Sequence, residues 1–312
     1  MTSFPLLKPG SLKPTLTQRV LRAAGQLQIP KIQGLYYKLG VLRDATPRHF
    51  TVWFAGLKYQ GRLDQHIDRY IYYFGAYSRA ELDFLDRAAE ILRNQRGALT
   101  FVDIGANVGQ HSLFMSGRAD RVVAFEPNEE AADQLEANLS LNRLNNVKVL
   151  RYALGSTDST GELGSGFKEN SGSRSLTWSL DTSKNSRVQV RQADRAITEL
   201  GVKRVDLLKI DVEGYEKEVL AGLAGTLRRD RSVFLIELVG GDVKGGFRSE
   251  AELRAALYDD HCLFTLRGAR KASLAAFDWE CEEAVCMPRE LVDHFKSLMI
   301  PSTRLTFDQF TA

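Results

Sequence analysis

The sequence has few cysteines, no long apolar run and no excess of charge of one sign. Its 312 residues include three cysteines, and the spacing of Cys281 and Cys286 has no second pair that would complete a zinc site. We therefore expect reduced thiols in the core of a cytoplasmic protein. No segment approaches the ~20 apolar residues of a membrane span, and residues 1–20 lack the apolar run of a signal peptide.

The charges of the chain nearly balance. Lysine and arginine together number 42, aspartate and glutamate 39, and the net charge is +3. The chain therefore lacks the excess of basic residues that is typical of nucleic-acid-binding proteins. Hydrophobic residues make up 44% of the chain and charged residues 26%, which indicates a globular protein and excludes disorder over the whole length.

We divide the chain into an N-terminal extension, residues 1–95, and a main domain, residues 96–312. Apolar residues at helical spacing predict a first helix in the extension: Leu16, Val20, Leu21, Ala24 and Leu27. We expect this helix to pack on the main domain; the alternative is a basic amphipathic helix that touches a membrane surface. A strand pair around Gly56 and further helices follow, and Ser78 and Glu81 have the spacing of a capping box.

From Leu99 onward, strand-length apolar runs alternate with helix-length amphipathic stretches. This order predicts a mostly parallel sheet with helices on both faces, in which ligands bind at the carboxyl ends of the strands. The Ser- and Gly-rich stretch at about 156–190 interrupts the pattern, and we interpret it as an inserted hairpin. The expected strands are Leu99–Ile104, Arg121–Phe125, Val147–Ala153, Val205–Ile210 and Ser232–Leu238, followed by an antiparallel pair, Cys262–Leu266 and Ala284–Met287.

The turn after the first of these strands is a candidate ligand-binding site. It reads VDIGANVG from Val102 to Gly109, and its glycines permit a sharp turn and a close approach of the backbone to a ligand. Asn107 replaces the middle glycine of the pyrophosphate-binding fingerprint G-x-G-x-x-G. Asp103 adds a negative charge, which disfavours a diphosphate and suits a cationic ammonium or sulfonium group.

Acidic residues end three further predicted strands. Glu126 ends the second strand. Its spacing in the sequence from the glycine turn is close to that of the acidic residue that binds the ribose of an adenosine in dinucleotide-binding folds. Successive side chains of a strand point to opposite faces of the sheet, so Lys209, Asp211 and Glu213 at the end of the fourth strand should lie on one side. Glu237 ends the fifth strand. We expect Asp211 and Glu213 to flank the reaction site.

The sequence segments that contain these residues, taken in order, resemble those of the FkbM-type S-adenosylmethionine-dependent methyltransferases. The similar segments, over roughly residues 65–240, are VDIGANVGQHS, AFEPN, NLSLN, RYALGS, LLKIDVEGYEKEVLAG and FLIEL. The resemblance implies an α/β, Rossmann-like class I methyltransferase fold: a mostly parallel seven-stranded sheet with an antiparallel last strand, here behind an N-terminal helix and hairpin extension. It implies contacts to the methionine part of the cofactor, its ribose and its adenine from Asp103, Gly105, Ala106, Asn107, Gly109, Glu126, Pro127 and Ala153.

The resemblance also implies O-methylation of a hydroxyl on a sugar, polyketide or related small metabolite, with S-adenosyl-L-methionine as cofactor. The catalytic candidates are Asp211, which would orient or deprotonate the hydroxyl, Glu213 and His111. Magnesium held by Asp211 and Glu237 is compatible with the residues but is not expected, so we predict no metal site. The alternatives are a nicotinamide-dependent oxidoreductase, against which Asn107 and Asp103 count, and a non-catalytic cofactor-binding scaffold.

The expected partner is a small-molecule acceptor, without nucleic acid or stable membrane insertion, and a homo-oligomer is compatible with the sequence. No N-P-P-Y-like motif follows the fourth strand, which argues against methylation of the amino groups of adenine or glutamine. Residues 1–50 and the insert match no pattern that would identify the acceptor.

Overall fold

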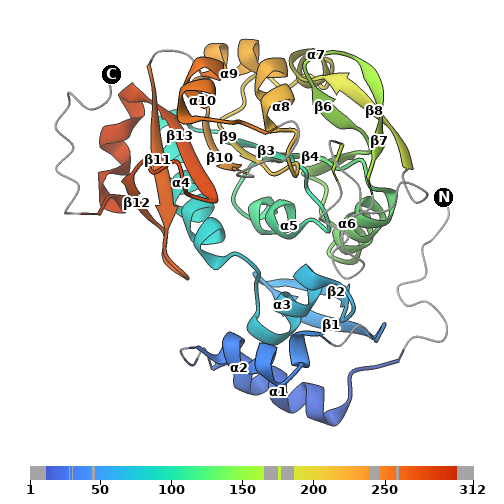
Figure 1. Cartoon of the computed structure of the whole chain (residues 1–312). Coiled ribbons are helices and arrows are strands. Elements are labelled where there is room, and N and C mark those ends of the chain that lie inside the picture. Colours follow the sequence, from blue (N-terminus) through green and yellow to red (C-terminus); the bar gives the residue numbers. More distant parts are fainter. Residues whose placement is uncertain are drawn as a thin grey trace.

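The computed structural model describes residues 12–27, 29, 31–43, 46–164, 175–176, 186–238, 246–257 and 260–300. They form a large sheet with helices on both faces and, below it in Figure 1, a smaller group of N-terminal helices and strands. None of the described helices has both the length and the apolar composition needed to cross a membrane. Cys262, Cys281 and Cys286 are free and buried, which confirms the prediction of core thiols.

The described residues form a central sheet of eight strands: β3 (Thr100–Ile104), β4 (Arg121–Phe125), β5 (Val147–Leu150), β9 (Leu207–Ile210), β10 (Val233–Glu237), β11 (His261–Arg267), β12 (Ser273–Ala276) and β13 (Glu283–Pro288). Their order is β12-β11-β13-β10-β9-β3-β4-β5. The strands from β10 to β5 run parallel, whereas β13 is antiparallel to both β10 and β11. The predicted class I methyltransferase sheet is therefore confirmed, with β12 as an additional edge strand antiparallel to β11.

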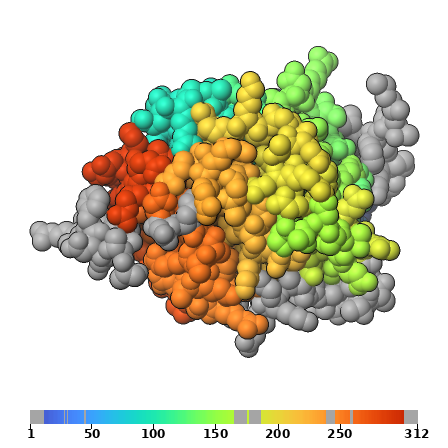
Figure 2. Space-filling view, turned by 90° about the horizontal axis from the view of Figure 1, so that it is seen from above, coloured from blue at the N-terminus to red at the C-terminus, as the bar shows by residue number. Residues whose placement is uncertain are grey.

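Helices pack on both faces of this sheet. They are α4 (Arg79–Arg96), α5 (Gln110–Ser116), α6 (Glu129–Leu141), α7 (Ala193–Glu199), α8 (Glu216–Gly222), α9 (Ala224–Asp230), α10 (Glu250–Ala256) and the 3-10 helix η3 (Arg289–Leu298). One apolar layer lies between the sheet and α7–α10, whose outer face Figure 2 shows in yellow and orange; the other face packs against α4–α6 and η3. The amphipathic stretch after β9 forms two helices, α8 and α9, which meet at Leu223.

The N-terminal elements form a separate group around an aromatic core. They are α1 (Leu16–Gln26), α2 (Ile32–Lys38), η1 (Val41–Arg43), β1 (His49–Phe54), β2 (Leu57–Arg62) and α3 (His66–Phe74). The strand pair predicted around Gly56 is confirmed. Side-chain amides of α6 and its C-cap hold the pair: Asn138 bonds to the backbone N–H and C=O of Gln60, and Asn142 does the same at Lys58.

Helix α1 is present where the sequence predicts it, but its packing differs from the prediction. Leu16, Val20 and Leu27 are exposed, and α1 contacts α3 through its opposite side, where Gln18 and Gly25 are buried. A Cβ at Gly25 would lie 2.5 Å from a backbone oxygen of α3. The close contact therefore depends on a residue without a side chain, and the expectation of apolar packing on the main domain is wrong.

The flanks of the predicted insert form an antiparallel pair, β7 (Ser159–Leu163) and β8 (Ser186–Gln192). Strand β8 also pairs in parallel with β6 (Ala153–Gly155), which completes a three-stranded sheet. The expected strand Val147–Ala153 is therefore divided between two sheets. Residues 165–174 and 177–185 of the insert lie outside the described residues.

Candidate functional site

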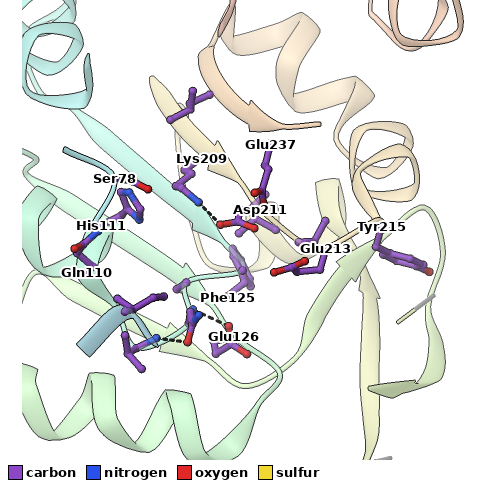
Figure 3. Close-up of a pocket in the computed structure, with 18 of the residues that line it drawn as sticks. Ser78, Gln110, His111, Phe125, Glu126, Lys209, Asp211, Glu213, Tyr215 and Glu237 are labelled. Atoms are coloured by element: carbon purple, nitrogen blue, oxygen red, sulfur yellow. Dashed lines mark hydrogen bonds and ion pairs between the residues drawn. The ribbon is translucent and has the colours of Figure 1, made fainter. Parts of the chain in front are cut away.

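A cavity of about 230 Å³ lies at the carboxyl ends of β3, β4, β9 and β10 (Figure 3). These strands are parallel neighbours, so the residues that follow them meet at one edge of the sheet. Residues of α3, α5, β13 and the first turn of α4 complete the walls. The cavity is lined by nine of the predicted site residues: Gly105, Ala106, Asn107, His111, Glu126, Pro127, Ala153, Asp211 and Glu213.

The glycine turn after β3 forms the floor of the cavity. Gly105 has a φ of 82°, and a Cβ there would lie 1.7 Å from the backbone oxygen of Asp211. Glycine is therefore required, because the turn after β3 touches the turn after β9 at this point. Asn107 also has positive φ, at 51°, and its side-chain oxygen accepts a 2.8 Å hydrogen bond from the N–H of Val108.

Asp103 and Gly109 lie behind this turn and do not line the cavity. Asp103 is buried at the end of β3, where its Oδ2 accepts a 2.7 Å hydrogen bond from the hydroxyl of Ser112. Its Oδ1 has no partner in the described part of the chain, and burial is the main cause of its raised pKa. Gly109 precedes α5, and a Cβ there would lie 2.2 Å from the side chain of Leu135.

Glu126 is held by two backbone N–H groups at the end of β4. Its Oε2 accepts a hydrogen bond from Asn107 and its Oε1 one from Asn128, each at 2.7 Å. Each oxygen keeps a further lone pair, because a carboxylate has about four acceptor positions. Burial raises the pKa of Glu126 to about 7, although the two backbone donors oppose this rise.

Lys209, near the end of β9, carries the positive charge of the cavity. Its Nζ lies 2.6 Å from Oδ2 of Asp211 and 3.9 Å from Oε2 of Glu81. Burial disfavours the ammonium ion, but these carboxylates outweigh burial and raise the pKa of Lys209. Lys209 in turn overcomes the effect of burial on Asp211 and holds the pKa of that carboxyl below its usual value.

Glu237 and Glu213 meet Asp211 at the same edge. Carboxylate oxygens of the three residues lie within 4.8 Å of one another. The charge of Asp211 and burial raise the pKa of Glu237, which shares a hydrogen bond with Asp211. Burial and the charge of Asp211 raise the pKa of Glu213 to about 8. The cluster therefore divides at neutral pH into ionised Asp211 and two protonated acids.

Glu81 is a cavity residue that the sequence analysis assigned to another role. The predicted capping box with Ser78 is wrong, because Ser78 makes no side-chain cap and the carboxyl of Glu81 is buried toward the cavity. Its Oε2 lies 3.1 Å from Nε2 of His111. Burial opposes ionisation, but Lys209 and His111 hold the pKa of Glu81 below its usual value. Burial and Glu81 together raise the pKa of Glu283 to about 9.

The lining is strongly acidic. Among the described residues it contains one lysine, no arginine and seven carboxyl groups: Glu81, Glu126, Asp211, Glu213, Glu237, Glu282 and Glu283. Such a cavity favours a cationic group and forms hydrogen bonds with hydroxyl groups.

The sheet order and a cavity at this edge define a class I methyltransferase, and known proteins identify the family. Residues 103–265 match the methyltransferase FkbM domain. The hexuronic acid methyltransferase AglP of Haloferax volcanii is 32% identical over 153 residues, which cover 48% of this chain and 62% of that protein. Methyltransferase sdnD of Sordaria araneosa is 33% identical over 155 residues, covering 39% of this chain and 59% of that protein.

A solved structure is also similar. The methyltransferase FkbM from Methylobacillus flagellatus KT has a TM-score of 0.41 and 16% identity, over 61% of this chain and 43% of that chain. This chain spans less than two thirds of the length of the two curated relatives. Because the family match extends over more than half of the residues, the chain belongs to the FkbM family of methyltransferases.

The contact between Glu81 and Lys209 generates a prediction about stability. The substitution Glu81→Gln keeps the shape of the side chain but removes one of the two negative charges beside the buried ammonium. We expect the free energy of unfolding in urea to fall by about 1–3 kcal/mol. The pKa of Glu81 is held below its usual value, so this loss is complete at neutral pH and shrinks only in acid.

The matched control for this variant is Glu90→Gln, because Glu90 is exposed on the same helix. Its unfolding free energy should change by less than about 0.5 kcal/mol. Equal stability of the two variants would show that the charge of Glu81 does not matter to the fold.

Proposed function

We propose that this chain transfers a methyl group from S-adenosylmethionine to a hydroxyl of a sugar, polyketide or related small metabolite. The observation that carries the proposal is the position of two carboxyl groups in one cavity: Glu126 after β4 and Asp211 after β9. Glu126 can accept hydrogen bonds from the ribose of a nucleoside, and Asp211 can accept one from the hydroxyl group of the acceptor. The name of the relative from Haloferax volcanii supports a sugar-type acceptor.

The residues of the cavity fit this cofactor. Both oxygens of Glu126 are held by backbone N–H groups, which leaves lone pairs for the two ribose hydroxyls. The glycine turn at Gly105, Ala106 and Asn107 lines the cavity beside Glu126. Ala153 and Pro127 line the cavity beside Glu126, where we place the adenine. When S-adenosylmethionine is bound, its sulfonium would supply the methyl group. An aligned oxygen would attack the methyl carbon, and the thioether sulfur would leave.

On the acceptor side, the two neighbouring acids suit different tasks. The pKa of Asp211 is held low, so this residue is a weak base, and its role is to accept a hydrogen bond and orient the hydroxyl. Glu213 has a pKa raised to about 8, so its carboxylate, which predominates above that pH, is a stronger base than Asp211 and the better acceptor for the hydroxyl proton. As the new O–C bond forms and the C–S bond breaks, the hydroxyl proton passes to the Glu213 carboxylate.

Magnesium remains unexpected in this mechanism. Asp211, Glu213 and Glu237 bring together oxygen atoms of the kind that bind this ion. The ammonium of Lys209, 2.6 Å from Asp211, already supplies a cation at this point.

The first prediction from this proposal concerns Glu126. The variant Glu126→Gln should bind S-adenosylhomocysteine more weakly by about 1.5–3 kcal/mol in calorimetry, because it loses a charged acceptor for the ribose. In the wild type, protonation of Glu126 with its pKa of about 7 removes this acceptor, so affinity should rise as the pH increases through that value. The variant should lack this pH dependence.

The control is Glu129→Gln, an exposed position on the following helix, which should bind as the wild type does. The nicotinamide alternative is tested in the same series: S-adenosylhomocysteine should raise the melting temperature and NAD should not. Stabilisation by NAD alone would reject the proposed cofactor.

The second prediction concerns the acceptor and Asp211. Incubation with S-adenosylmethionine and a panel of neutral sugars and polyols should yield a product heavier by one methylene in mass spectrometry. The variant Asp211→Asn should lower turnover about 10²-fold, because the hydroxyl loses its orienting partner, and should lower the affinity for S-adenosylhomocysteine much less.

The surface variant Asp293→Asn serves as the control, since Asp293 is exposed on η3. A chelator should leave turnover unchanged, and its loss would assign a metal to the acidic cluster. A chain that binds the cofactor but methylates no acceptor in the panel would support the non-catalytic scaffold instead.

The third prediction concerns Glu213 and pH. Because the pKa of Glu213 is raised to about 8, its protonated form predominates below that pH and cannot accept a proton. Turnover at saturating substrate should therefore rise as the pH increases through this range. In Glu213→Gln the rise should disappear and turnover should remain low throughout. A variant that keeps the wild-type pH profile would show that another group takes the proton.

A further inference from the structure

Helix α1 presents its apolar side to solvent. Leu16, Val20 and Leu27 recur at helical spacing on one side and are 77%, 60% and 73% exposed. On the other side of α1, Gly25 contacts the backbone of α3, and Leu21 is the partly buried apolar residue that packs against the N-terminal core. An amphipathic surface helix ordinarily turns its apolar stripe toward the core, so the reversed orientation of α1 leaves an apolar face that requires a partner.

Other elements of the N-terminal group also carry exposed apolar side chains. All of the large apolar side chains that are exposed in the described residues lie between positions 12 and 53. Besides those of α1, they are Leu12, Ile29, Leu35, Tyr37, Leu39 and Trp53. Scattered exposed apolar residues are ordinary on a protein surface, but a group confined to one part of the chain marks an interaction site.

The same part of the chain is almost purely basic. Residues 1–63 contain ten lysines and arginines and one acidic residue, Asp44. A groove of about 420 Å³ beside α1 is lined by Lys13, Arg19 and Arg22 together with aromatic rings of β1 and α3. The guanidinium of Arg22 lies 5.7 Å from the centre of the Tyr72 ring, so this groove combines cationic and aromatic side chains.

We propose that α1 and the adjoining basic groove form a docking surface for an anionic lipid bilayer. The exposed leucines and Trp53 would enter the boundary between headgroups and acyl chains, and the cations of the groove would face the lipid phosphates. An aliphatic helix face flanked by lysine and arginine is typical of helices that lie in the interface of an anionic membrane. The helix lies on the surface and does not cross it.

The position of this surface relates it to the cavity. Helix α1 rests on α3, and His66 and Ile67 of α3 line the cavity. In Figure 1, α1 and α2 lie on the side of α3 that faces away from the central sheet. A docked molecule would therefore hold its cavity close to the bilayer, separated from it by the α3 layer. The inference rests on α1 and the groove and does not depend on the proposed methyl transfer.

The test is flotation of the full chain with vesicles. The chain should float with vesicles of equal parts phosphatidylcholine and phosphatidylglycerol, remain behind with phosphatidylcholine alone, and be released by high salt. Replacing Leu16, Val20 and Leu27 together by serine should lower the bound fraction by about tenfold. Because these side chains are exposed, the melting temperature of this variant should equal that of the wild type.

A charge-reversal pair tests the groove. Lys13→Glu with Arg19→Glu should lower binding by about tenfold, whereas the control Lys148→Glu with Lys203→Glu, at exposed positions outside the N-terminal group, should change it by less than about twofold. Equal binding to both vesicle types, or binding retained by the serine variant, would overturn the proposal. So would light scattering that shows a dimer which the serine variant converts to a monomer, since the face would then join two copies.

Discussion

The buried ammonium of Lys209 sets the charge state of the whole cavity. It compensates Asp211 and Glu81, which it contacts from two sides, and the pKa of each is held low. No second lysine and no arginine is present in the described lining. The carboxyl groups beside these two ions have raised pKa values: that of Glu237 because of the charge of Asp211 and burial, and that of Glu283 because of burial and the charge of Glu81. One cation thus determines which acids are ionised.

The acids at the two ends of the cavity are held in place in different ways. Near β4, Glu126 is positioned by backbone donors alone, so its geometry follows from the turns after β3 and β4. Near β9 and β10, the acids are positioned by one another and by Lys209. A rigid backbone cradle is suited to a constant ligand, whereas a set of interacting side chains can be altered residue by residue. The fold therefore permits the acceptor to change while the cofactor half stays the same.

Much of the fold could be predicted because strand ends and glycine turns are local signals. The parallel sheet, its reversed strand and the meeting of Glu126 with Asp211 follow from alternation and from the rule that strand ends share an edge. Glu81 could not be placed, because its spacing from Ser78 imitates a local cap and its true partners, His111 and Lys209, are distant in sequence. The orientation of α1 was missed for a related reason: periodicity identifies an apolar face but not what the face contacts. The roles assigned to the site residues remain predictions.

The two asparagine side chains that hold β2 have a consequence for solubility. One edge of β2 pairs with β1, and along the other the amides of Asn138 and Asn142 occupy the main-chain groups of Gln60 and Lys58. These amides imitate the hydrogen bonds of a neighbouring strand without being one. An open edge of this kind would otherwise be a template for a foreign strand and for aggregation. Asn138 and Asn142, the first and last residues of the NLSLN segment, therefore cover the open edge of the two-stranded sheet and keep it from pairing with a strand of another molecule.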